Sequence, residues 1–180
     1  TLSLHDALPI YKVSSPFRLE SLNKSHDRLL FDCGEEALNR YFQTQATQDC
    51  RRRISNCFVA IDSEPGNVAG YYTLSSASIP TLDLPEDITN RLPRYPSIPA
   101  VRIGRLAVDK RFQGHGLGKA LLADAAIKTI YATPASFALI VDAKNEQAVE
   151  FYQHHGFRLL SNTLNILFLP LATAEKCLIL

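Results

Sequence analysis

The residues in this chain with the clearest chemical meaning are the glycines of one short segment, Gln113 to Gly118, which reads QGHGLG. The segment follows an apolar run from Val101 to Val108 and precedes a helical pattern that extends to Ile130. It is therefore predicted to join a strand to a helix. The first N–H groups of a helix lack partners and lie at the positive end of its dipole, so they attract phosphate oxygens. Because glycines lack the Cβ atoms that would keep a phosphate away, the segment is predicted to bind a phosphate group.

The spacing of the glycines distinguishes between phosphate-binding motifs. A dinucleotide-binding fold requires G-x-G-x-x-G with a later acidic residue, and a P-loop requires G-x-x-x-x-G-K-[ST]; neither pattern is present in that spacing. The order Gln113-x-x-Gly116-x-Gly118 instead resembles the coenzyme A signature, [QR]-x-x-G-x-[GA], of the GNAT superfamily of N-acetyltransferases. A tight turn before a helix would use similar residues, so the downstream sequence has to decide.

A second motif lies downstream of the first. An apolar run, Phe137–Asp142, is predicted to be a strand, and the segment Asn145–Phe157 follows it. That segment resembles the GNAT helix pattern N-x-x-A-x-x-[FL]-Y-x-x-x-G-F at every position. Three upstream segments resemble the GNAT toxins of bacterial toxin–antitoxin modules: FDCGEEALN from Phe31, GYYTLS from Gly70 and GRLAVD from Gly104. The resemblance extends over residues from about 14 to 170.

The resemblance implies an α/β GNAT fold with acetyl-CoA as the cofactor. The sheet would be mixed and mostly antiparallel, with six to seven strands splayed at the cofactor site and about four flanking helices. Backbone N–H groups near Leu106 to Val108 would bind the acetyl carbonyl and the pantetheine arm. The cofactor-binding residues implied are Leu106, Ala107, Val108, Gln113, Gly114, His115, Gly116, Leu117, Gly118, Lys119 and Asn145. Asn145 has a second interpretation, since it could simply cap its helix.

Tyr152 is the catalytic residue that the resemblance implies. A phenol has a pKa of about 10, above the roughly 8.5 of a thiol, so it stays protonated at neutral pH and can give a proton to a departing thiolate. The alternative is a tyrosine that packs its ring and makes one hydrogen bond. No general base is evident, and an α-amine with a pKa of about 7.7 to 8.0 is already substantially neutral at cellular pH.

GNAT toxins acetylate the free α-amine of aminoacyl-tRNA and so stop translation, and the resemblance implies the same function here. One alternative is a GNAT enzyme that acetylates a small amine or a protein N-terminus. Another is a module that binds acyl-CoA without catalysis. The resemblance further implies a ribbon-helix-helix antitoxin as partner, a homodimer, and contact with DNA only through the antitoxin.

Positive charge occurs in short groups, although the net charge is only +1 and does not by itself indicate nucleic-acid binding. Residues predicted to contact tRNA phosphates are Arg51, Arg52 and Arg53, then Arg91 and Arg94, then Lys110 and Arg111, with Lys119 supporting them. The alternative for the first of these groups is a solvated helix end, where cations suit the dipole. The alternative for the second group is an ordinary surface loop.

Length and composition indicate one globular domain with a substantial core. Residues 11–180 are predicted to form it, and residues 1–10, TLSLHDALPI, are predicted to be a non-native or disordered extension. No apolar run has the roughly 20 residues of a membrane-spanning helix and no secretory segment is evident, so the chain is predicted to be cytoplasmic, with no membrane partner. The cysteines show no spacing suited to a metal, so none is predicted.

Hydrophobic patterns predict the remaining elements. The first helix is predicted to begin at Asp32, whose carboxylate would cap it, and to continue through Ala46. The five prolines from Pro80 to Pro99 predict an irregular segment that serves substrate binding. Residues 171–180 are predicted to be an apolar tail that docks on the body or on a partner. Further strands are predicted at 17–22, 56–62, 68–77, 157–160 and 166–169.

Overall fold

The computed structural model describes residues 17–63 and 66–178, so the extension predicted at residues 1–10 lies outside the described residues. The strands are β1 (Phe17–Ser21), β2 (Asn56–Asp62), β3 (Val68–Pro80), β4 (Ser97–Val108), β5 (Ala138–Asp142), β6 (Arg158–Leu159) and β7 (Ile166–Pro170). The helices are α1 (Glu36–Thr44), α2 (Ala46–Arg51), α3 (Glu86–Thr89), α4 (Leu117–Ile130), α5 (Glu146–His154) and α6 (Leu171–Leu178). Two 3-10 turns lie at Thr81–Asp83 and Lys110–Phe112. None of the helices in these residues is long and apolar enough to cross a membrane.

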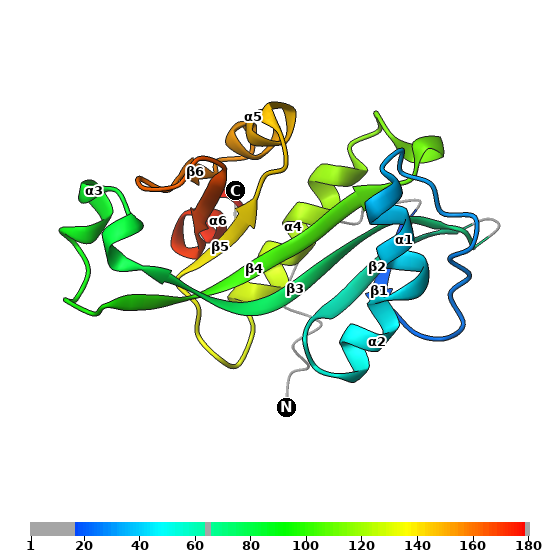
Figure 1. Ribbon diagram of the computed structural model, residues 1–180, viewed down its shortest axis with the longest axis horizontal. Helices are drawn as coiled ribbons and strands as arrows, with labels where there is room; N and C mark the ends of the chain where they lie inside the picture. The colour runs from blue at the N-terminus through cyan, green and yellow to red at the C-terminus, as the bar shows by residue number, and fades with distance from the viewer. Residues whose placement is uncertain (1–16, 64–65, 179–180) are drawn as a thin grey trace.

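The strands form one sheet in the order β1-β2-β3-β4-β5-β7-β6 (Figure 1). Neighbouring strands are antiparallel except β4 and β5, which are parallel. The parallel pairing is short, because it ends where Ile103 meets Val141. β4 then continues to Val108 beside β3 alone. This confirms the predicted mixed, mostly antiparallel sheet, which is open between β4 and β5.

Helices cover both faces of the sheet, because successive side chains of a strand point to opposite faces. α1 and α2 cover one face, where Phe42 and Ala46 pack with Tyr71 of β3. α4 and α6 cover the other face, where Leu121 and Leu171 belong to the largest buried cluster. In Figure 1 α4 accordingly lies behind β3 and β4, whereas α1 lies in front of the sheet.

The first helix differs from its prediction. α1 begins at Glu36, and its N-cap residue Glu35 makes no side-chain cap. The Asp32 carboxylate instead accepts hydrogen bonds from the Gly34 N–H (2.9 Å) and from the Asn39 side chain (2.8 Å). The helix also divides at Gln45. Just before the break, the Thr44 hydroxyl donates to the Arg40 carbonyl (2.7 Å), a bond that often bends helices.

The proline-containing segment is more regular than predicted. β3 and β4 pair as far as Pro80 and Ser97, and only the residues between them form the 3-10 turn, α3 and loop. Pro99 lies inside β4, where its carbonyl accepts the Phe137 N–H (2.9 Å). A proline can occupy a strand position where its backbone only has to accept a hydrogen bond. Proline content alone therefore predicted the wrong length for both strands.

The predicted tail forms α6, and its residues Leu171 and Ala174 pack in the same buried cluster as α4. It therefore docks on the body of the protein. The described residues contain six α-helices, whereas the resemblance implied about four. The first predicted helix is divided into α1 and α2, and α3 and α6 were not predicted as helices.

Candidate active site

The open edge of β4 is the first component of the site. The Asp109 N–H donates to the Ala69 carbonyl of β3 (2.8 Å), and Ala107 pairs with Tyr71. Because strand residues direct their N–H groups alternately to the two sides, Leu106 and Val108 direct theirs away from β3, into the gap that β5 leaves. Ala107 directs its N–H toward β3, so its predicted role as a free donor was wrong.

The loop between β4 and α4 is the second component. Gly114 and Gly116 have φ values of +78° and +81°, a left-handed conformation that glycine adopts without strain. A Cβ added at either residue would meet nothing within 4 Å, so both face open space. Gly116 is the N-cap of α4 and offers no capping side chain, which leaves the N–H groups of the first turn for a ligand. We call residues Gly114–Lys119 the cradle.

Gln113 holds the cradle in place. Its side-chain amide donates to the Val108 carbonyl (2.8 Å) and to the Cys33 carbonyl (3.0 Å). These bonds join the end of β4, the cradle and the segment before α1. The side chain predicted to bind the cofactor therefore positions the loop.

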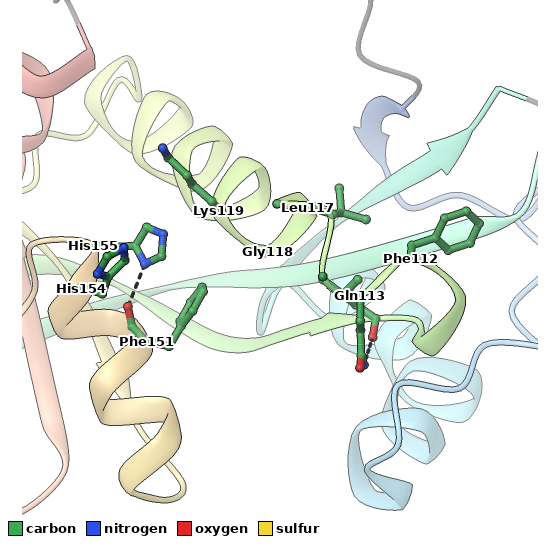
Figure 2. A pocket seen from close by; sticks show the side chains of 11 residues that line it. Phe112, Gln113, Leu117, Gly118, Lys119, Phe151, His154 and His155 are labelled. Carbon is green, nitrogen blue, oxygen red and sulfur yellow. Dashed lines mark hydrogen bonds between the residues drawn. The ribbon is translucent and has the colours of Figure 1, made fainter.

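A cavity of about 380 Å³ opens beside the cradle. Its lining combines the cradle glycines and Val108 with Lys119 and with three residues of α5 and its C-terminus, Phe151, His154 and His155. Figure 2 shows the Phe151 ring pointing from α5 toward the first turn of α4, where a Cβ on Gly118 would lie 3.6 Å from it. His155 Nδ1 lies 2.7 Å from the Phe151 carbonyl oxygen. The cavity thus presents backbone donors, the Lys119 ammonium group and two imidazole rings together with an apolar wall.

This arrangement fits the diphosphate of coenzyme A. A diphosphate needs N–H donors and positive charge at close approach, and the cradle supplies the donors without a Cβ in the way. His115 is exposed in the cradle and Lys119 is exposed on the first turn of α4, so both are available to an anion.

Tyr152 lies on α5, and its ring packs against Phe151 and Phe157 with centroid distances of 5.2 and 5.3 Å. Burial raises the pKa of Tyr152 to about 12, so the phenol is protonated over the whole physiological range. Within the described residues its hydroxyl has no hydrogen-bond partner. The hydroxyl is therefore a proton donor that is not hydrogen-bonded to an acceptor among the described residues.

Asn145 caps α5, because its side-chain oxygen accepts the Ala148 N–H (2.8 Å). The structure thus shows one of the two roles weighed for this residue. Gly156, with a φ of +90°, follows the last turn of the same helix, as its motif predicts.

The predicted basic residues do not form one surface. Lys110 pairs with Asp32 (2.8 Å), and Arg111 pairs with the buried Asp109 (2.9 Å), so both charges are engaged within the protein. Arg51, Arg52 and Arg53 are exposed at the end of α2, and Arg91 and Arg94 are exposed after α3. α2 and α3 lie far apart along the long axis in Figure 1.

Two arginines of β4 were not singled out from the sequence. Arg102 and Arg105 are half-buried beside the point where β4 separates from β5. The available signal was their presence in the otherwise apolar strand VRIGRLAV, since charged residues are seldom buried without a partner.

Known proteins share this architecture over most of the chain. The model of the acetyltransferase (GNAT) domain matches residues 29–166. A tRNA-acetylating toxin of Mycobacterium tuberculosis is 32% identical over 148 residues, which cover 81% of this chain and 85% of the toxin. The solved structure of AtaT complexed with acetyl-methionyl-tRNAfMet has a TM-score of 0.82 at 33% identity, covering 90% of this chain and 99% of that chain. A mutant of AtaT with phenylalanine in place of a tyrosine, bound to the C-terminus of the antitoxin AtaR and to acetyl-CoA, has a TM-score of 0.75 at 30% identity, covering 91% and 99%.

Proposed function

The chain belongs to the GNAT acetyltransferase family, and we propose that it is a toxin that acetylates the free α-amine of aminoacyl-tRNA and thereby blocks translation. The observation that carries the proposal is the open edge of β4, which lies between the cradle and α5, the helix of Tyr152. The similarity to a tRNA-acetylating toxin over 81% of the chain supports the choice of substrate.

Each component of the site has a chemical task in this reaction. Acetyl-CoA supplies an acetyl group activated as a thioester. The cradle N–H groups bind the anionic diphosphate, and the N–H groups of Leu106 and Val108 stabilise negative charge on the acetyl oxygen. Tyr152, which its raised pKa keeps protonated at physiological pH, donates a proton to the departing thiolate. The proton that the amine nitrogen loses on acylation restores the phenol. The α-amine of an aminoacyl ester needs no strong base, because a substantial fraction is neutral at cellular pH.

We also propose the assembly that such a toxin requires. A ribbon-helix-helix antitoxin binds it and a second copy completes a homodimer; the antitoxin is supported by the complex of AtaT with the C-terminus of AtaR. The substrate places the reaction in the cytoplasm. Residues 11–180 form the single domain, and Arg51, Arg52, Arg53, Arg91 and Arg94 are further tRNA contacts.

The decisive experiment is acetyl transfer from radiolabelled acetyl-CoA to a pool of charged tRNA. The expected product is an N-acetylated amino acid, released by mild base and identified by mass spectrometry. Deacylated tRNA is the matched control, because it retains every phosphate and lacks the amine. A coupled translation reaction should stop only when acetyl-CoA is present.

The competing function has a distinct outcome. If charged tRNA stays unmodified while small amines or peptide N-termini are acetylated, the chain is a GNAT enzyme of another specificity. If none of these acceptors reacts although acetyl-CoA binds, the chain is an acyl-CoA-binding module. Either result would overturn the toxin proposal.

A further inference from the structure

Arg102 and Arg105 share one face of β4, opposite α4. Arg105 lies over the ring of Tyr41 in α1, with its guanidinium carbon 3.5 Å from the ring centroid. Ile103 packs into the cluster beneath α4, whereas Ala100 packs into the cluster of the other face, beside α3. Because strand side chains alternate, Arg102 lies on the face of Ala100, between the area covered by α1 and the area covered by α3.

These arginines flank an irregularity in the strand. The β3–β4 register shifts so that Thr73 pairs with Arg105 and Leu74 with Ile103, which leaves Gly104 as an extra residue. The pairing of β4 with β5 ends at the same place, at Ile103. Bulges of this kind re-aim side chains, and here Arg102 and Arg105 lie on either side of the start of the open edge.

Among the described residues, neither guanidinium group is neutralised by a carboxylate, and Arg105 contacts the ring of Tyr41. Neither arginine has an ion pair or a hydrogen-bonded side-chain partner in the part of the chain that the structure describes, and both are only half-buried. The nearby carboxylate of Asp49 is occupied by the Tyr41 hydroxyl (2.9 Å) and by Gln45 (3.1 Å). In Figure 1 no helix covers the front of β4 between α1 and α3.

We propose that Arg102 and Arg105 bind phosphodiester groups at the 3′ end of the aminoacyl-tRNA and hold its α-amine at the open edge of β4. A guanidinium binds phosphate through two parallel N–H donors, and stacking on Tyr41 orients Arg105 in advance. The pair lies on the sheet face opposite α4, so the acceptor would approach the open edge of β4 from that face. Small amines and peptide N-termini carry no phosphodiester, so the pair would select the substrate. This inference rests on the proposed function.

Salt dependence of RNA binding tests the proposal directly. The probe is a fluorescein-labelled RNA hairpin that contains an acceptor stem ending in CCA. Its binding is measured by fluorescence anisotropy at several salt concentrations. Removing the protein's hold on one phosphate of a single strand should lower the slope of log K against log salt by about 0.7. Arg102→Gln and Arg105→Gln should each weaken binding roughly tenfold and reduce the slope, because each removes charge-assisted hydrogen bonds. Arg105→Lys should retain most of the slope but only part of the affinity.

The control variant is Arg18→Gln, which removes an exposed arginine of β1 that pairs with Glu20; its slope should equal that of the wild type. Acetyl-CoA affinity, measured by calorimetry, should be unchanged in all variants, which shows that each remains folded. In kinetics, the glutamine variants should raise KM for an aminoacylated CCA trinucleotide and leave KM for the corresponding aminoacyl-adenosine unchanged.

Two failures are distinguishable. If the wild type acetylates aminoacyl-tRNA but the variants keep its slope and its KM, the arginine pair is structural and this inference alone is wrong. If the wild type neither binds the hairpin nor acetylates charged tRNA, the proposed function fails and this inference fails with it.

Discussion

At the scale of single residues, Tyr152 is where the chemical hypothesis can be tested most directly. Its hydroxyl has no protein partner among the described residues, so Tyr152→Phe removes a proton donor and no structural bond. We expect acetyl transfer to fall by roughly 10²- to 10⁴-fold, the usual contribution of a positioned acid. Single-turnover transfer measures this, and acetyl-CoA affinity, measured by calorimetry, should not change. A variant with the wild-type rate would show that Tyr152 only packs.

The raised pKa of Tyr152 sets the expected pH profile. Burial raises that pKa to about 12, and a phenol is the protonated donor below its pKa. The rate should therefore rise as the substrate α-amine loses its proton, around pH 7.7 to 8.0, and then stay level to about pH 10. A profile of single-turnover rates from about pH 6 to 10 measures this. A decline beginning near pH 9 would contradict this assignment.

Gly116 offers a residue-scale test of the cradle. Gly116→Ala places a Cβ at a φ of +81°, which costs on the order of 1 to 2 kcal/mol, and the new methyl group would occupy the space of the diphosphate. We expect reduced stability in urea denaturation and at least roughly tenfold weaker acetyl-CoA binding.

The matched control is Gly66→Ala, in the turn between β2 and β3. Gly66 has a φ of +85°, and a Cβ there also meets nothing within 4 Å. It should lose similar stability while acetyl-CoA affinity is unchanged. Equal loss of affinity in both variants would indicate that general destabilisation, and not the cradle, explains the effect.

At the scale of elements, α5 depends on its cap. Asn145→Ala removes the bond to the Ala148 N–H and should cost about 1 kcal/mol in the free energy of unfolding. Asn145→Asp, which can still cap, should restore most of it. If Asn145→Ala left stability unchanged but weakened acetyl-CoA binding tenfold, Asn145 would be a cofactor contact instead of a cap.

Elements with a strong local pattern could be predicted from the sequence. β2 has the bounds expected at residues 56–62, and α4 ends at Ile130 as expected, because alternation and helical spacing are properties of neighbouring residues. The start of α1 could not be predicted in this way. Asp32 is drawn into a turn by Gly34 and Asn39 and into an ion pair with Lys110, and the ion pair depends on a residue far along the chain.

At the scale of the whole molecule, the sequence indicated the family and the general position of the site. It did not indicate how distant residues combine there. The end of β4–β5 pairing at Ile103 and the stacking of Arg105 on Tyr41 both depend on tertiary packing. The sequence could not place the basic groups relative to one another for the same reason, and the folded chain separates α2 from α3 (Figure 1).

The ion pair between Asp32 and Lys110 predicts how acid affects the molecule as a whole. It joins the segment before α1 to the turn before the cradle, two parts of the chain 78 residues apart. The hydrogen bond from Lys110, together with those from Gly34 and Asn39, lowers the pKa of Asp32 from 3.8 to about 2. A carboxyl whose pKa is lowered on folding stabilises the native state above its unfolded pKa, and this stability is lost as pH falls through its folded pKa. The contribution of Asp32 should therefore decline below about pH 4 and be lost as the pH falls through about 2.

Asp32→Asn should accordingly be less stable than the wild type at neutral pH. The difference should be small because both side chains are more than half exposed, and it should vanish once the pH falls below about 2. Urea midpoints across this pH range measure the difference.

Asp32→Asn should also weaken acetyl-CoA binding, because Gln113 attaches the cradle to Cys33 of this segment. Glu20→Gln is the matched control, since Glu20 is a carboxyl of lowered pKa that pairs with Arg18 on β1. It should alter acid stability without altering acetyl-CoA affinity, and a similar loss of affinity in both variants would show that the Asp32 segment does not support the cradle.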